Sequence, residues 1–169
     1  MCSLVCDHEA QCGGHCIMGS DGTPVQISSI EHYISDAYLD KLSIEREPDK
    51  GQNVAVIGSG PAGLTVAVKM AALGYNVTIF ERMDKIGGMM RYGIPDFRLP
   101  HTILDRYGKK LLELGIQIRP NTTIGGALHL DTLLDDGYDA IFIGSGAWRP
   151  RSLGVKGESL GNCHYAVDY

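Results

Sequence analysis

The stretch "NVAVIGSGPAGLTVAVKMAALGYNVTIFE", residues 53–81, decides the fold. It begins with a short apolar strand, continues through a glycine-rich turn that opens a helix, and ends in a second β-rich strand. Pro61 suits the first position of that helix, and Gly74 suits the residue just beyond its end. Such a βαβ unit predicts an α/β fold built on a parallel sheet.

The turn carries three glycines in the spacing Gly-x-Gly-x-x-Gly, directly after the first strand. Gly58 permits the tight turn, Gly60 lets the backbone approach a pyrophosphate, and Gly63 lets the helix pack on the strand. The N-terminus of the helix offers free N–H groups to the phosphates. Glu81, about twenty residues on, can bond ribose hydroxyls and would repel a 2′-phosphate. The pattern therefore predicts a Rossmann-like site for FAD or NAD, not for NADP.

The chain divides into three parts around this unit. Residues 1–46 form a small, cysteine-rich and mainly helical segment, and residues 47–52 form a polar linker interrupted by Pro48 and Gly51. Residues 53–169 form the N-terminal part of the Rossmann-like domain. The parallel sheet of that domain is therefore expected to be incomplete.

Further elements are predicted on both sides of the βαβ unit. Residues 28–42, "SSIEHYISDAYLDKL", have apolar residues three and four apart, which predicts an amphipathic helix of about three turns. Ser28 and Glu31 have capping-box spacing at its start. Residues 82–100 are rich in Gly and Pro and predict a long loop of the kind that is usually functional. The remaining predictions are a helix at 101–115, a strand at 116–119, a helical turn at 130–137 and a buried strand at 139–147.

Composition and charge exclude several classes of protein. The chain has 169 residues and a net charge of −5, and it has no long basic run, so we expect no nucleic-acid-binding surface. Its apolar stretches are too short to span a bilayer, and its N-terminus lacks the profile of a signal peptide. We therefore predict a cytoplasmic protein that binds neither membrane nor nucleic acid. In a reducing compartment, its five cysteines are not expected to form a disulfide framework.

Four of the five cysteines lie in "MCSLVCDHEAQCGGHCIMG", residues 1–19, with the spacing C-x3-C-x5-C-x3-C. Thiolates in glycine-rich turns suit an iron–sulfur cluster. Zinc is the alternative, with His8 and His15 as further donors, although zinc sites usually pair shorter knuckles. A flavin site downstream favours iron–sulfur, because a flavin exchanges single electrons with such a cluster and zinc cannot. The candidate thiolate ligands are Cys2, Cys6, Cys12 and Cys16.

Two downstream motifs favour FAD over NAD. The pair Gly87-Gly88 follows Glu81 closely and resembles the second motif of flavoproteins that have two dinucleotide-binding domains. The strand at 139–147 ends in "GSG", residues 144–146, where those flavoproteins have Ala-Thr-Gly. Small residues are kept, so the departure is chemically mild.

The fingerprint together with "GGMMRYGIPDFRLP", residues 87–100, resembles the small (β) subunit of NADPH-dependent glutamate synthase. The same module occurs in dihydropyrimidine dehydrogenase and in the large subunit of the NADH-dependent ferredoxin:NADP oxidoreductase complex. The resemblance implies an oxidoreductase that passes electrons from NADPH or NADH through FAD to 4Fe–4S clusters, with a larger catalytic subunit as partner. No catalytic side chain is predicted, because the cofactor carries the hard step. The candidate FAD-binding residues are Gly58, Gly60, Pro61, Ala62, Gly63, Glu81, Arg82, Gly87, Gly88, Arg91 and Gly146.

The resemblance also divides the cysteines between two clusters. It implies a non-cysteine ligand at the start of the following helix, where this chain has Glu31. A capping box explains Glu31 without any metal, so both readings stay open. Our hypothesis places Cys6, Cys12 and Glu31 on one cluster and directs Cys16 toward another.

The family has a further cysteine group upstream and an NAD(P)H-binding domain downstream, and this chain contains neither. We therefore expect a fragment of a longer protein, with little NAD(P)H oxidation of its own. The alternative function is a non-catalytic, zinc- or cluster-stabilised nucleotide-binding module.

Overall fold

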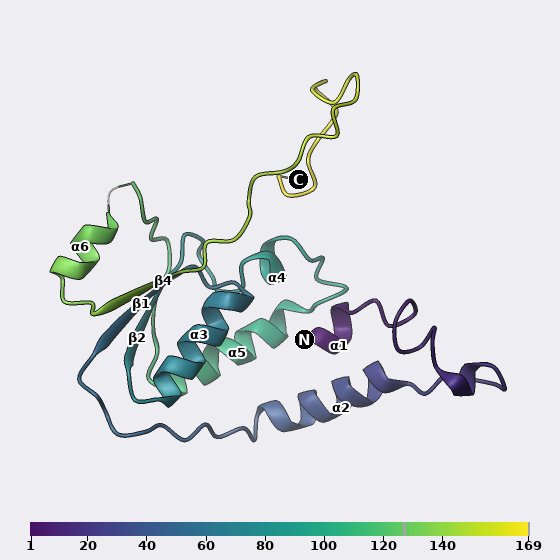
Figure 1. Ribbon diagram of the computed structural model, residues 1–169, viewed down its shortest axis with the longest axis horizontal. Coiled ribbons are helices and arrows are strands. Elements are labelled where there is room, and N and C mark those ends of the chain that lie inside the picture. The colour runs from purple at the N-terminus through teal and green to yellow at the C-terminus, as the bar shows by residue number, and fades with distance from the viewer. Residues whose placement is uncertain (127, 169) are drawn as a thin grey trace.

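A four-stranded sheet forms the centre of the computed structural model, which describes residues 1–126 and 128–168 (Figure 1). The strand order is β3-β2-β1-β4, and each neighbouring pair is parallel. The strands are β1 (Asn53–Ile57), β2 (Asn76–Phe80), β3 (Gln117–Arg119) and β4 (Ala140–Ile143). The predicted α/β class with a Rossmann-like parallel sheet is confirmed.

The helices cover both faces of this sheet. They are α1 (Cys2–Val5), α2 (Ile27–Leu39), α3 (Pro61–Ala72), α4 (Met89–Tyr92), α5 (His101–Glu113) and α6 (Leu130–Asp135), and Ile17–Gly19 forms a 3-10 turn. Helices α3 and α5 lie on one side of the sheet and α6 lies by the other (Figure 1). Within the described residues, no helix is long and apolar enough to cross a membrane.

The core follows the two-residue alternation of the strands. Val54 and Val56 of β1 point to the side of α3 and α5, where Leu104 is fully buried. Ala55, between them, points to the other side and packs with Phe80 and with Leu133 of α6. Each face of the sheet therefore has its own apolar cluster, and the larger one lies under α3 and α5.

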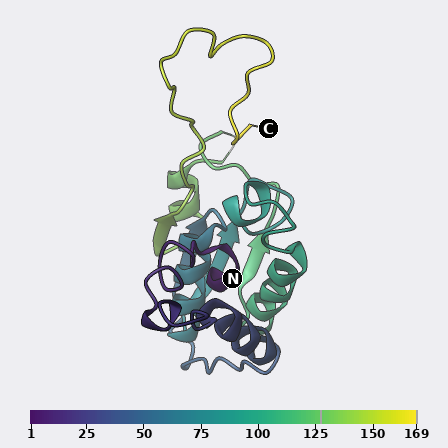
Figure 2. The same cartoon turned by 90° about the vertical axis from the view of Figure 1, so that its right-hand side faces the viewer.

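Strand β4 is correctly located by the sequence, but the prediction that it is buried is wrong. It pairs with β1 on one side and is the edge strand of the described sheet. Ile143 is 59 % exposed, and none of the four residues of β4 is buried. Beyond β4 the chain runs away from the sheet as an extended arm (Figures 1 and 2). An apolar run alone therefore did not distinguish an edge strand from a central one.

Helix α2 begins two residues earlier than a capping box at Ser28 requires. Its N-cap is Gln26, whose side chain makes no capping hydrogen bond. The backbone N–H of Ile30 donates to the carbonyl of Gln26 at 3.1 Å, so Ser28 already lies inside the first turn. The predicted helix is confirmed, but the predicted Ser28–Glu31 capping box is wrong.

Helix α2 turns charged side chains toward α5 and apolar ones away from it. Arg106 of α5 forms ion pairs with Asp36 and with Asp40, the latter at 3.0 Å, and donates to the Asp36 carbonyl at 2.9 Å. Leu39 is the one α2 residue that is buried. The apolar residues predicted to share a face are exposed: Ile30, Tyr33, Ile34 and Tyr38. The ion pairs of Arg106 are therefore one part of the attachment of α2, beside the buried Leu39.

Replacing Arg106 with alanine is expected to loosen α2 without disturbing the sheet. The hydrogen bond from Arg106 holds the pKa of Asp36 below its usual range. Because this pKa is lowered in the folded state, the pair contributes fully above the ordinary Asp pKa of about 3.9. The contribution is lost as the pH falls through the lowered value. Added salt should weaken the pair as well, since the partners are partly exposed.

Hydrogen exchange of the α2 amides measures this effect. Exchange, corrected for its intrinsic pH dependence, should rise in Arg106→Ala, and in the wild type on acidification or added salt. Lys109→Ala removes an exposed charge from the same helix and is the matched control. Equal protection of α2 in both variants would contradict the prediction.

Candidate functional site

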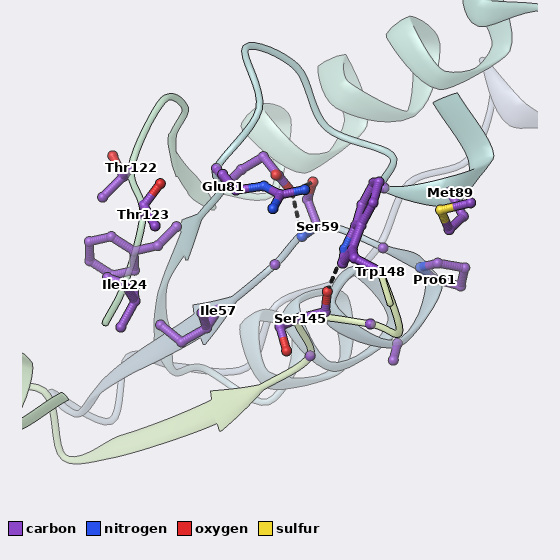
Figure 3. A pocket seen from close by; sticks show the side chains of 18 residues that line it. Ile57, Ser59, Pro61, Glu81, Met89, Thr122, Thr123, Ile124, Ser145 and Trp148 are labelled. Atoms are coloured by element: carbon purple, nitrogen blue, oxygen red, sulfur yellow. Dashed lines mark hydrogen bonds between the residues drawn. The ribbon is translucent and has the colours of Figure 1, made fainter. Parts of the chain in front are cut away.

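A cavity of about 350 Å³ opens at the carboxyl ends of β1, β2 and β4 (Figure 3). Its walls come from the turn between β1 and α3, the end of β2, residues 88–89, residues 122–124, residues 144–146 and Trp148. Ligands of open parallel sheets bind outside the carboxyl ends of the strands, so this is the expected position for a dinucleotide. The predicted site residues that line the cavity are Gly58, Gly60, Pro61, Ala62, Glu81, Arg82, Gly88 and Gly146.

Two glycines of the turn meet different requirements. A Cβ on Gly63 would lie 1.9 Å from the carbonyl oxygen of Gly58, so a side chain there would prevent the close packing of α3. A Cβ on Gly60 would meet nothing within 4 Å, and Gly60 lines the cavity. The first amides of α3 lack intrahelical acceptors, and the helix dipole is positive at this end. The open space at Gly60 therefore fits the pyrophosphate of a dinucleotide.

Glu81 is almost fully buried, with 5 % of its surface exposed, and its carboxylate points toward the turn. Oε2 accepts hydrogen bonds from the Ser59 backbone N–H at 2.9 Å and from the Ser59 hydroxyl (Figure 3). Oε1 accepts a third, from the backbone N–H of Met83 at 2.8 Å. The sequence identified the acid but missed Ser59, because any small residue satisfies that position of the fingerprint.

Trp148 with Ser145, and residues 122–124, line the wall but were not among the predicted site residues. The Arg82 guanidinium lies over the ring of Trp148, with Cζ 4.7 Å from the ring centroid. The indole N–H of Trp148 donates to the carbonyl of Ser145 at 2.8 Å, which fixes the ring (Figure 3). Across the cavity, residues 122–124 follow the carboxyl end of β3. They belong to no motif, but the rule that parallel strands end at one edge could have found them.

Three predicted site residues, Gly63, Gly87 and Arg91, lie outside the cavity wall. The buried Arg91 side chain donates from Nε to the carbonyl of Ile86 at 2.8 Å and pairs with Asp105 at 2.5 Å. The N–H of Gly87 donates to the hydroxyl and to the carbonyl oxygen of Ser59. This placement gives Gly87 and Arg91 a role in holding the loop after β2, next to the wall.

The cysteines of the N-terminal segment are free thiols and are not gathered into one site. The described residues contain no group of three or more His, Cys, Asp and Glu side chains that could hold a metal ion. Glu31 is exposed on α2. The amides of Val25, Met18 and Gly19 lower the pKa of Cys16, with Val25 contributing most, which favours its thiolate. The donors therefore fit an iron–sulfur cluster in kind but not in arrangement.

Comparison with known proteins agrees with the geometry of the cavity. The profile of the pyridine nucleotide-disulphide oxidoreductase family matches residues 18–137. The NADPH glutamate synthase small chain of Mycobacterium tuberculosis is 37 % identical over 163 residues, covering 95 % of this chain and 33 % of the relative. The corresponding chain of Bacillus subtilis is 39 % identical with the same coverage. The chain thus spans about a third of the length of these curated relatives.

A solved structure shows the same architecture. FprA from Mycobacterium tuberculosis, determined in complex with NADPH, superposes with a TM-score of 0.61 and 25 % identity. The superposition covers 72 % of this chain and 28 % of FprA.

Proposed function

Because the chain belongs to the pyridine nucleotide-disulphide oxidoreductase family, we propose that its cavity binds FAD and forms the flavin site of a glutamate synthase-like oxidoreductase. The observation that carries this proposal is the open position at Gly60, which lies between the N-terminus of α3 and the buried Glu81. In a dinucleotide, the pyrophosphate would lie at the N-terminus of α3 and the ribose attached to it would lie at Glu81.

Each part of the wall has a distinct task in this proposal. The first amides of α3 would bind the pyrophosphate, and the Glu81 carboxylate would accept a hydrogen bond from the adenosine ribose. The stacked Arg82 and Trp148 side chains would shield the bound dinucleotide from water. Bound FAD would supply the redox chemistry that the side chains lack, taking up two electrons as a hydride and releasing them singly.

Equilibrium dialysis of the purified chain against FAD tests the proposal. We expect one FAD per chain, displaced by ADP but not by adenosine 2′,5′-bisphosphate, because the Glu81 carboxylate repels a 2′-phosphate. A chain that retains no FAD, or that binds both competitors equally well, would overturn the assignment.

The relatives that are named as NADPH glutamate synthase small chains support a proposal for the wider reaction. We propose that NADPH or NADH reduces the flavin from a domain outside this chain, and that a larger catalytic subunit receives the electrons. The cysteine segment would hold the iron–sulfur centre between them. In the described residues its thiols are not assembled into one group.

Anaerobic reconstitution with iron and sulfide is expected to yield a brown, iron-containing chain. Cys16→Ser should lower the bound iron, because the amides around Cys16 favour its thiolate. Cys163→Ser, at an exposed thiol far along the chain, should leave it unchanged. Glu31→Ala should alter the reduced-state EPR spectrum if Glu31 is a ligand. A colourless chain that binds zinc would instead support the non-catalytic module.

A further inference from the structure

The hydroxyl of Ser59 links two parts of the site that lie far apart in the sequence. Ser59 is fully buried, with 0 % of its surface exposed. Its Oγ donates its single hydrogen to Oε2 of Glu81 and accepts a hydrogen bond from the N–H of Gly87 at 3.1 Å. A relay of this kind strengthens each of its members, because each bond polarises the next. The turn, the end of β2 and the loop after β2 are thereby joined at one atom.

The loop after β2, which Ser59 holds, lies directly on the turn between β1 and α3. The N–H of Gly87 also lies 3.1 Å from the carbonyl oxygen of Ser59. A Cβ on the next residue, Gly88, would lie 2.9 Å from the Cα of Gly60. Because Gly88 lines the cavity, a shift of this loop would change the space left for a pyrophosphate.

The Glu81 carboxylate has little freedom left. An ionised carboxylate offers about four acceptor positions, and Ser59 and Met83 occupy three of them. The remaining position can accept one hydrogen bond from a ligand, in a direction set by the other three. Without the Ser59 hydroxyl, the carboxylate would lose one of the bonds that set this direction.

We propose that Ser59 is a positioning residue that sets the preference of the site for a free ribose hydroxyl. It orients Glu81 toward the 2′-hydroxyl of an adenine dinucleotide and holds the Gly87-Gly88 loop against the turn, without itself bonding the ribose. The inference rests on the proposed function for the identity of the ligand. The coupling between Ser59 and the loop belongs to the ligand-free chain and can be tested separately.

The ligand test displaces FAD from the full chain with ADP and with 2′-deoxy-ADP. Ser59→Ala should weaken FAD binding about tenfold, the effect of losing roughly one hydrogen bond to a charged group. It should also reduce the preference for ADP over 2′-deoxy-ADP toward one. Ser59→Thr, which keeps the hydroxyl, should restore the preference. The double variant with Glu81→Gln should bind no more weakly than Glu81→Gln alone.

The ligand-free test is hydrogen exchange of residues 82–92, which should speed up in Ser59→Ala. Ser29→Ala, at an exposed serine on α2, is the control and should not change that segment. If the wild type binds no FAD, the proposed function fails while this experiment still decides the coupling. Unchanged exchange in Ser59→Ala, or equal weakening of ADP and 2′-deoxy-ADP, would overturn the role of Ser59.

Discussion

Replacing Gly63 with alanine should destabilise the domain by about 3 kcal/mol or more, at the upper end of overpacking effects. The new Cβ would lie 1.9 Å from the Gly58 carbonyl oxygen and 3.3 Å from a methyl group of Val56. The first contact is with backbone in a tight turn, so no side-chain rotation can relieve it. Thermal or denaturant unfolding followed by circular dichroism would measure the loss.

Gly60→Ala is the matched control in the same turn. Its Cβ would meet nothing within 4 Å, so unfolding should shift by no more than about 0.5 kcal/mol. The methyl group would nevertheless occupy the space that the proposed pyrophosphate needs, so FAD binding should fall at least about tenfold, or 1.4 kcal/mol. A Gly63→Ala chain as stable as wild type would refute the packing argument. A Gly60→Ala chain that binds FAD normally would refute the placement of the pyrophosphate.

Leu104→Ala should cost about 2–5 kcal/mol of the free energy of unfolding, as for other fully buried leucines. Leu104 is 0 % exposed on α5 and belongs to the larger apolar cluster. One of its methyl groups also lies 3.3 Å from where a Cβ of Gly87 would stand, so it supports the loop beside the cavity. The variant should therefore lose FAD affinity as well as stability.

Leu112→Ala on the same helix gives the comparison. Leu112 is 60 % exposed, so its replacement should change the free energy of unfolding by no more than about 0.5 kcal/mol. Each variant replaces leucine with alanine in α5, so the change in helix propensity is the same in both. Chemical denaturation of both variants would therefore measure the contribution of burial to the free energy of unfolding. Equal losses in the two variants would show that the core is not where the structure places it.

The βαβ unit could be predicted because local and long-range signals agree there. The strand pattern before Gly58, Pro61 at the start of α3 and Gly74 beyond its end all favour the same structure, and β1, α3 and β2 follow it. The cavity could be placed for the same reason, since the turn between β1 and α3 that forms one of its walls lies within this unit. Consistency between levels of structure is what makes such a segment predictable.

The predictions that failed depended on contacts between distant segments. Burial of β4 depends on what lies beyond it in the sheet, and its apolar sequence does not encode this. The apolar face of α2 was visible in the sequence, but it is exposed, and the opposite side of the helix pairs with Arg106, more than sixty residues away. Ser59 was missed because its role depends on hydrogen bonds to Glu81 and Gly87, which fold back onto it.

The strand order affects how the sheet forms while the chain is synthesised on the ribosome. Strand β1 lies between β2, which follows it closely in the sequence, and β4, which follows much later. Where β1 and β4 pair, Asn53 donates a hydrogen bond to Asp139, which lies 86 residues further along the chain. At synthesis rates of roughly 5–20 residues per second, β4 is synthesised on the order of 4–17 s after β1. Throughout this interval one edge of β1 stays open to pairing with other chains. Protection by chaperones during translation should therefore matter more for this chain than its modest size suggests.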